Sequence, residues 1–501
     1  MAPLKNGQKI YTIMKIAVIG SGVGGLAVAA KMSAKGFHVT VFEKNGTPGG
    51  KISEIKDKGY RFDTGPSLFT LPHLVNEITD IPCHTLENSC RYFYDDGTVL
   101  NFYQQRERLK EEIESNSRED FSNIEKRLNN SKEVYDLTAD LFLFNPFGKL
   151  SNFVKPENRK IAFKLHKLGF FRTMHAANRA LFKDKRIVQL FDRYATYNGS
   201  SPYRAPATLN MISHLEHNIG AFFPKKGIYS IVTSLYNKCL ENGAEFLFNT
   251  HVSKIVIDKK EKRATGLIAN GKEYLFDIVV SNSDAKYLAE NMMPSNIKHP
   301  YLNRLKKTEP SSSALIFYWG VKGEFPQLDI HNILFSKEYK KEFIHLFYKM
   351  DLYHDPTVYI FISKKIVPSD APDKCENWFV MVNAPANIGQ NWHEIIQRTR
   401  SQIIKKINSA LQGVDIEQLI KTEHIASPVT IEKNTLSSRG SLYGTSSNSP
   451  FAAFLRHPNS IDKIKNLYFV GGSVHPGGGI PLCIAGAGIV EREICNEYNP
   501  L

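Results

Sequence analysis

A glycine-rich turn near the start of the chain constrains the fold more than any other feature. Residues 15–19, Lys-Ile-Ala-Val-Ile, form a short apolar run typical of a buried strand, and an Ala-rich helical segment begins at Leu26. Between them Gly20, Gly22 and Gly25 have the spacing G-x-G-x-x-G. The first glycine permits a tight turn, the second lets a pyrophosphate approach the backbone, and the third packs helix against strand. This spacing predicts a dinucleotide site.

Glu43 strengthens this prediction. It ends the next strand-like run, which begins at Val39, and lies about 20 residues beyond the turn, where a carboxylate accepts hydrogen bonds from ribose hydroxyls. A glycine turn without a ligand does not explain this acidic residue. The small residues Gly49 and Gly50, followed by Lys51, let the backbone meet a cofactor that extends further than NAD, which favours FAD. An ordinary glycine turn is the alternative for that segment.

A second glycine-rich segment near the C-terminus predicts another part of the cofactor site. Residues 471–481, Gly-Gly-Ser-Val-His-Pro-Gly-Gly-Gly-Ile-Pro, follow the strand-like run 466–470 and precede a helical stretch. The free N–H groups at the positive end of a helix favour an anionic group, such as a reduced flavin ring.

The chain is long enough for more than one core, since 501 residues exceed the usual range of about 100 to 200 per domain. We expect an α/β fold: a Rossmann-type FAD-binding domain with a parallel sheet, and an inserted α+β substrate domain of mixed sheet and helices. Residues 14–100, 226–300 and 461–501 are assigned to the FAD-binding domain. Residues 101–225 are assigned to a helical, membrane-facing insertion and residues 301–460 to the sheet and helices of the substrate domain.

Composition excludes several classes of protein. Hydrophobic residues make up 42% and charged residues 23%, which argues against a disordered chain and against a polytopic membrane protein. No apolar run reaches the ~18 to 20 residues that span a bilayer. The six cysteines form no close pair, so we expect a reducing compartment and no metal site.

The net charge of +14 suits nucleic acid, anionic lipid or solubility. No basic run carries interleaved aromatic residues in a nucleic-acid-binding pattern, so we expect no nucleic-acid partner. Residues 160–172 mix cations with bulky apolar side chains, which is typical of a segment at a lipid headgroup boundary. A solvated helix with one face in the core is the alternative.

From Met14 to the C-terminus the chain resembles the bacterial-type carotenoid desaturases, a family that includes phytoene desaturase. One departure is Val474, at a place where the family often has threonine; Ser473 offers a hydroxyl next to it. The matching segments are the glycine turn with Glu43, residues 48–51 (Pro-Gly-Gly-Lys), 62–67 (Phe-Asp-Thr-Gly-Pro-Ser), 197–202 (Tyr-Asn-Gly-Ser-Ser-Pro), 222–227 (Phe-Phe-Pro-Lys-Lys-Gly), 280–284 (Val-Ser-Asn-Ser-Asp) and 471–485.

The resemblance implies an FAD enzyme that is cytoplasmic and peripheral, on the inner face of the cell membrane, and takes an apolar carotenoid into an elongated tunnel. It implies hydride transfer from an allylic methylene to the flavin, with oxygen or a quinone as the electron acceptor. Residues 194–199 and 214–217 resemble those of Bacteroidetes-type enzymes, which favours 3,4-desaturation of a 1-hydroxycarotenoid such as 1-hydroxy-γ-carotene. A phytoene desaturase, a flavin amine oxidase, and a carotenoid isomerase or flavin-bearing carrier are the alternatives.

Few side chains are candidates for catalysis. Arg172 resembles an arginine that some family members place near the polyene, with a headgroup contact or a salt bridge as the alternative. His475 resembles a residue beside the flavin, with a structural role as the alternative. Asp63 is expected to cap backbone rather than to abstract protons. The expected cofactor contacts are Gly20, Ser21, Gly22, Val23, Gly24, Gly25, Glu43, Lys44, Gly49, Gly50, Lys51, Gly65, Pro66, Ser67, Val252, Gly472, Ser473, Gly478, Gly479 and Ile480.

Aromatic residues in two apolar runs either line the tunnel or belong to the core. These residues are Phe222, Phe223, Phe317, Tyr318 and Trp319.

Overall fold

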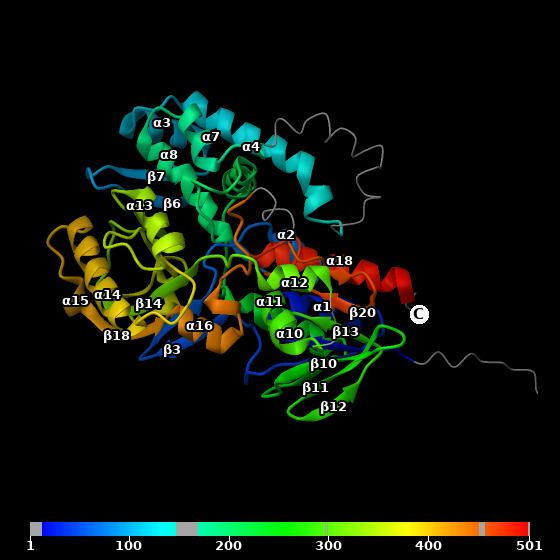
Figure 1. The fold of residues 1–501 in the computed structure, drawn as a ribbon. Helices are drawn as coiled ribbons and strands as arrows, with labels where there is room; N and C mark the ends of the chain where they lie inside the picture. Colours follow the sequence, from blue (N-terminus) through cyan, green and yellow to red (C-terminus); the bar gives the residue numbers. More distant parts are fainter. Residues whose placement is uncertain (1–12, 147–168, 296, 298, 450–455, 499–501) are drawn as a thin grey trace, which may run out of the picture.

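A computed structural model describes residues 13–146, 169–295, 297, 299–449 and 456–498. Two sheets dominate these residues, and helices cover both (Figure 1). Most of the segment 160–172 lies outside the described residues, so the expectation of a headgroup-binding helix is not addressed there. Within the described part of the chain, every helix is too short or too polar to cross a membrane.

The first sheet is built around a parallel core of five strands. Its order is β20-β13-β1-β2-β9, and β10, β11, β12 and β19 extend it at one side. The bounds are β1 (Lys15–Ile19), β2 (His38–Phe42), β9 (Glu245–Leu247), β10 (Val252–Asp258), β11 (Arg263–Ala269), β12 (Lys272–Leu275), β13 (Ile278–Ser281), β19 (Ser460–Ile461) and β20 (Ile464–Phe469). Strands from the beginning, middle and end of the chain thus share one sheet.

Helix α1 (Val23–Ala34) packs against this sheet and against α10 (Tyr229–Glu241) and α18 (Ile480–Tyr498). Its close approach to the strand requires glycine at one position. A Cβ on Gly25 would lie 2.1 Å from the carbonyl oxygen of Gly20, far inside van der Waals contact. The third glycine of the turn therefore has the packing role that its spacing predicts.

The second sheet is antiparallel except at one pair of strands. Its order is β18-β14-β17-β16-β15-β6-β7, and only β15 and β6 run parallel. The bounds are β6 (Asn88–Phe93), β7 (Val99–Tyr103), β14 (Ser313–Lys322), β15 (His331–Leu334), β16 (Val358–Ile362), β17 (Cys375–Ala384) and β18 (Ile420–Ala426). Helix α14 (Trp392–Ala410) packs on this sheet through its apolar residues.

One expected boundary differs from the structure. Strands β6 and β7 fall largely within residues 14–100, the first part of the expected FAD-binding domain, but they pair with the second sheet. The physical reason is that β6 finds its partner β15 more than 200 residues away, and a hairpin's own sequence does not show which sheet it joins.

The described part of residues 106–219 is mainly helical, and its helices lie together at the top of Figure 1. Two helices begin this region, α3 (Arg106–Asn116) and α4 (Phe121–Phe142), and Asp120 caps the second one by accepting from the Ser122 N–H. Helices α7 (Met174–Leu181) and α8 (Lys185–Asp192) follow. Smaller elements are β3 (Ser53–Asp57), β4 (Tyr60–Thr64), α2 (Pro72–Asn76), β5 (Cys83–Thr85), a 3-10 turn (Arg193–Asn198), α9 (Ile212–His214), β8 (Phe222–Pro224), α11 (Ala285–Tyr287), α12 (Pro300–Lys306), α13 (Tyr339–Ile344), α15 (Ile416–Leu419) and α16 (Pro428–Thr435).

Candidate cofactor and substrate site

One large cavity, of about 550 Å³, connects the first sheet with the second. The glycine turn after β1 and the segment before α18 line one part of it. Apolar side chains of the second sheet line another part: Ile316, Ile333, Phe379 and Met381. A polar, glycine-rich part and a part that contains these apolar side chains therefore belong to a single cavity.

Glu43 organises the glycine turn. Its Oε2 accepts from the Ser21 N–H at 2.9 Å and from the Ser21 hydroxyl at 2.7 Å, and its Oε1 accepts from the Asn45 N–H at 2.9 Å. The side chain is buried yet lines the cavity. Ser21, itself fully buried, thus holds the carboxylate in place and does not line the cavity.

Two cations line the cavity, the half-buried Lys51 and the buried Arg456. Lys51 donates to the carbonyl oxygens of Ser441 and Leu442 at 2.9 and 2.6 Å, and burial lowers its pKa. Arg456 donates to the carbonyl oxygen of Tyr443 at 3.0 Å, and burial lowers its pKa to about 10. Neither cation forms an ion pair with a carboxylate among the described residues. An anionic ligand would supply the missing charge.

These features fit a dinucleotide with a flavin ring. The first turns of α1 and α18 carry no acidic side chain, so both positive helix ends accept an anion. Open backbone at Gly20 and Gly22 accepts a pyrophosphate, and Glu43 is available to ribose hydroxyls.

The structure brings together almost all of the predicted cofactor residues. All of them line the cavity except Ser21, which holds Glu43, and Gly25, which packs against Gly20. Asp63 accepts from the N–H groups of Ile228 and Tyr229, both at 2.9 Å, so its capping role is confirmed. The aromatic residues proposed for the tunnel are not among the lining residues, and Phe223, Phe317, Tyr318 and Trp319 are buried core.

The two candidate catalytic side chains have different surroundings. His475 lines the cavity, and its Nε2 lies 3.0 Å from the carbonyl oxygen of Asn145. Arg172 is exposed, donates to the carbonyl oxygen of Ala176 at 2.7 Å and is not a lining residue. The structure therefore does not support Arg172 beside a polyene in this cavity; the chain turns it outward just before α7.

A different arginine lies at the cavity and was missed from the sequence. Arg193 is buried, and its Nη2 donates to Glu216 Oε1 at 2.6 Å. Tyr197 also donates to this carboxylate, at 2.5 Å to Oε2, and Tyr92 accepts from Arg193 Nε at 2.8 Å. Both partners of the ion pair belong to, or adjoin, the segments 194–199 and 214–217 that carry the resemblance. The sequence did contain a signal for a buried charge here. Asp192 and Arg193 stand between the largely apolar residues 187–191 and the residues Tyr194 and Ala195.

Four buried histidines predict a pH dependence of stability. Burial lowers the pKa of His217 to about 3 and those of His331, His457 and His475 to about 4, from 6.5. Below pH 6.5 the unfolded chain binds more protons than the folded one, so acid destabilises the fold. We expect each histidine to lower the free energy of unfolding by up to about 1.4 kcal/mol per pH unit between pH 6.5 and 4, offset in part by Glu342, whose pKa burial raises to about 7. Denaturant unfolding at several pH values measures this, and a flat profile would contradict it.

Several known proteins are similar to this chain. The family model of flavin containing amine oxidoreductases matches residues 23–488. The 1-hydroxycarotenoid 3,4-desaturase of Flavobacterium sp. (strain P99-3) is 44% identical, with 96% of this chain and 99% of that protein covered. The chain belongs to this flavoprotein family, among its carotenoid desaturases. The expectation of a flavin, FAD, as cofactor is thereby confirmed.

More distant relatives match nearly the whole chain. The phytoene desaturase of Fusarium fujikuroi is 30% identical, with 96% of this chain and 89% of that protein covered. Among solved structures, an oxidoreductase from Methanosarcina mazei has a TM-score of 0.63 at 15% identity, covering 96% of this chain and 100% of that one. Putrescine oxidase bound to putrescine has a TM-score of 0.61 at 11% identity, covering 97% and 99%. These structures confirm the expected fold.

Proposed function

We propose that the chain introduces the 3,4 double bond into a 1-hydroxylated carotenoid such as 1-hydroxy-γ-carotene. The observation that carries this proposal is the single cavity, in which a dinucleotide cradle opens into a chamber walled by apolar side chains of the second sheet. The Flavobacterium relative, 44% identical over nearly its whole length, bears the name of that activity.

A carotenoid chain suits the apolar chamber. It offers no carbonyl or phosphate, so its binding depends on burial of hydrocarbon against side chains such as Ile316, Ile333 and Met381. When bound, FAD would accept the hydride from an allylic methylene, and the neighbouring carbon would lose a proton, so that the C–H electron pair left there forms the new double bond. The protein aligns the polyene and excludes water. His475 is neutral because burial lowers its pKa to about 4, which fits an orienting role beside the ring.

We propose that FAD contacts those predicted cofactor residues that line the cavity. We propose that residues 14–87, 226–300 and 460–498 form the FAD-binding domain. Oxygen or a quinone is the proposed electron acceptor.

A peripheral position on the inner face of the cell membrane suits an apolar substrate. Phe171, which is 99% exposed, and the neighbouring exposed Arg172 support a lipid contact there. Sedimentation with anionic vesicles measures that contact.

Product analysis tests the proposed reaction. The FAD-loaded protein is incubated in liposomes with 1-hydroxy-γ-carotene or with phytoene, and the carotenoids are separated by chromatography. We expect a product with one additional double bond from the hydroxylated substrate. Conversion of phytoene alone would establish the second candidate, a phytoene desaturase, which the 30% identical fungal relative favours. A product at the oxidation level of its substrate would instead indicate an isomerase.

A further inference from the structure

Strand β15 places a buried histidine with an unpartnered ring nitrogen at the cavity. His331 is 3% exposed and is a lining residue. Its Nδ1 lies 2.7 Å from the hydroxyl of Tyr359, and its ring stacks on Phe361 with centroids 5.2 Å apart. Its Nε2 is buried and has no hydrogen-bond partner among the described residues. A buried polar atom without a partner costs about 1 to 3 kcal/mol, which a ligand that pairs with it would remove.

His331 belongs to a row of polar groups that begins at the cofactor site. The Ser67 hydroxyl lies 2.6 Å from the Tyr359 hydroxyl, which in turn contacts His331. Ser67 follows Gly65 and Pro66, and all five residues line the cavity. Apolar side chains such as Ile333 and Phe379 line the cavity around this row, together with polar side chains such as Thr357 and Asn383. Among the polar side chains of this lining, His331 is distinguished by a buried ring nitrogen without a partner among the described residues, at the end of a row that begins at the predicted cofactor residue Ser67.

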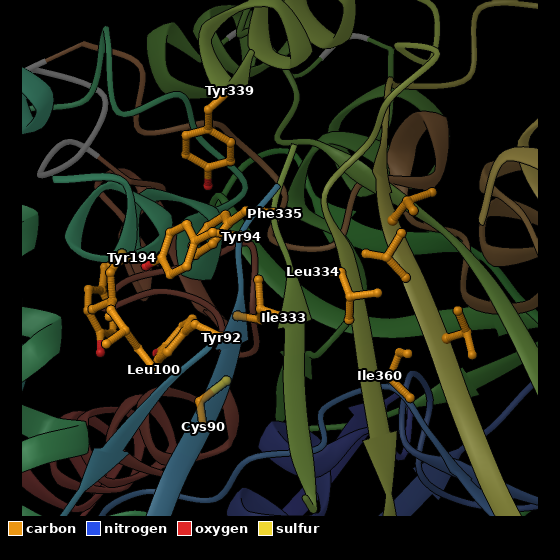
Figure 2. Packing of buried hydrophobic residues seen from close by; sticks show 14 of the residues in the cluster. Cys90, Tyr92, Tyr94, Leu100, Tyr194, Ile333, Leu334, Phe335, Tyr339 and Ile360 are labelled. Carbon is orange, nitrogen blue, oxygen red and sulfur yellow. The ribbon is translucent and has the colours of Figure 1, made fainter. Parts of the chain in front are cut away.

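The nearby buried ion pair is not a comparable contact point. Glu216 already accepts from Arg193, Tyr194 and Tyr197. Figure 2 shows Tyr194, which comes from the helical region, beside Tyr92 of β6, with Cys90 further along that strand. Cys90 and His331 are both lining residues on the neighbouring strands β6 and β15. The ion pair is thus internally satisfied, whereas His331 Nε2 is open.

The chemistry of a 1-hydroxycarotenoid matches this position. Only two carbon–carbon bonds separate the carbon that carries the hydroxyl from the first carbon of the new double bond. The hydroxyl must therefore lie close to the reacting carbons, on the cofactor side of the cavity. Burial lowers the pKa of His331 to about 4, so its ring is neutral and has one donor and one acceptor nitrogen. With Nδ1 engaged by Tyr359, Nε2 either donates or accepts, and a hydroxyl satisfies both states.

We propose that His331 Nε2 binds the tertiary hydroxyl of the substrate, and that Tyr359 is the residue that positions it. This inference rests on the proposed function and names the group that selects a hydroxylated carotenoid over a plain hydrocarbon. A hydrocarbon leaves Nε2 unpaired, so it binds less well. A methyl ether accepts a hydrogen bond but cannot donate one, so it pairs with Nε2 only where Nε2 is the donor.

The test measures kcat/KM in liposomes for three substrates: 1-hydroxy-γ-carotene, its methyl ether and γ-carotene. The wild-type protein is compared with the His331→Phe variant. The wild-type protein is expected to prefer the hydroxylated substrate by about 10- to 100-fold. In His331→Phe this preference is expected to fall to about threefold or less, chiefly through a slower reaction of the hydroxylated substrate. Tyr359→Phe is expected to lose part of the preference. Tyr318→Phe is the matched control, since Tyr318 is buried in the same sheet but does not line the cavity.

The outcomes separate the inference from the proposed function. A wild-type protein that converts no carotenoid overturns the proposed function. A wild-type protein that converts all three substrates equally, or a His331→Phe variant with the wild-type preference, overturns the inference alone. If His331→Phe does not fold, His331→Gln replaces it. The Gln amide has a donor and an acceptor at positions that differ from Nε2, so we expect its preference for the hydroxylated substrate to lie between that of the wild-type protein and complete loss. An unchanged preference in both His331→Gln and Tyr359→Phe overturns the inference.

Discussion

The Glu43→Ala variant is expected to fold but to lose its flavin. Glu43 accepts three hydrogen bonds that shape the glycine turn, from the N–H and hydroxyl of Ser21 and from the N–H of Asn45. Hydrogen bonds to a charged group are worth about 1.5 to 3 kcal/mol each, so loss of the carboxylate together with its ribose contact is expected to weaken FAD binding about 100-fold or more. Titration of the apoprotein with FAD, followed by flavin fluorescence, measures the dissociation constant.

Glu245→Ala is the matched control for this experiment. Glu245 begins β9, the neighbour of β2 in the same sheet, and its side chain is 62% exposed. The control is expected to bind FAD as tightly as the wild-type protein. Stoichiometric flavin in purified Glu43→Ala, with a wild-type dissociation constant, would contradict the assignment of this site.

Arg193→Met is expected to destabilise the second-sheet core by about 3 to 5 kcal/mol. The side chains of Arg193 and Glu216 are 7% and 2% exposed, so removal of the cation leaves a buried carboxylate uncompensated. The variant also loses the contact of the guanidinium with the ring of Tyr194, 4.4 Å from its centroid. Denaturant unfolding followed by tryptophan fluorescence measures the change, because all three tryptophans lie in the same core as Tyr194.

Two further variants separate charge from packing. Arg193→Met combined with Glu216→Gln leaves no uncompensated charge, and we expect it to recover part of the lost stability. Arg204→Met removes an ion pair with Glu309 whose side chains are 31% and 39% exposed, and we expect a loss below about 1 kcal/mol. Equal losses of stability in Arg193→Met and Arg204→Met would contradict the expected effect of burial at the Arg193–Glu216 pair.

Local sequence was sufficient to predict residues that come together at the candidate cofactor site, because the parts of this site are local. The strand, the turn and the helix from Lys15 to Ala34 are continuous, and each glycine has a distinct steric task. The segment 471–481 combines a strand end, a turn and a helix start in the same way. Almost the whole predicted set of cofactor residues lines one cavity for this reason.

The substrate side could not be predicted as well, because it depends on contacts between distant residues. Arg193 contacts Tyr92, about a hundred residues away, and His331 reaches the cavity only because β15 joins β16 on one side and β6 on the other. Helical spacing does not show which arginine turns inward. Arg172 and Arg193 lie close in the sequence, yet the first is exposed and the second is buried among aromatic rings.

The most direct test of the central claim is anaerobic reduction of the bound flavin by substrate. The FAD-loaded protein is mixed in oxygen-free liposomes with 1-hydroxy-γ-carotene or with phytoene, and the visible absorption of flavin and carotenoid is followed together. We expect the flavin to bleach with the hydroxylated substrate as the polyene absorption shifts to longer wavelength. Flavin that stays oxidised with both carotenoids, in protein that binds them, would contradict desaturation by this chain.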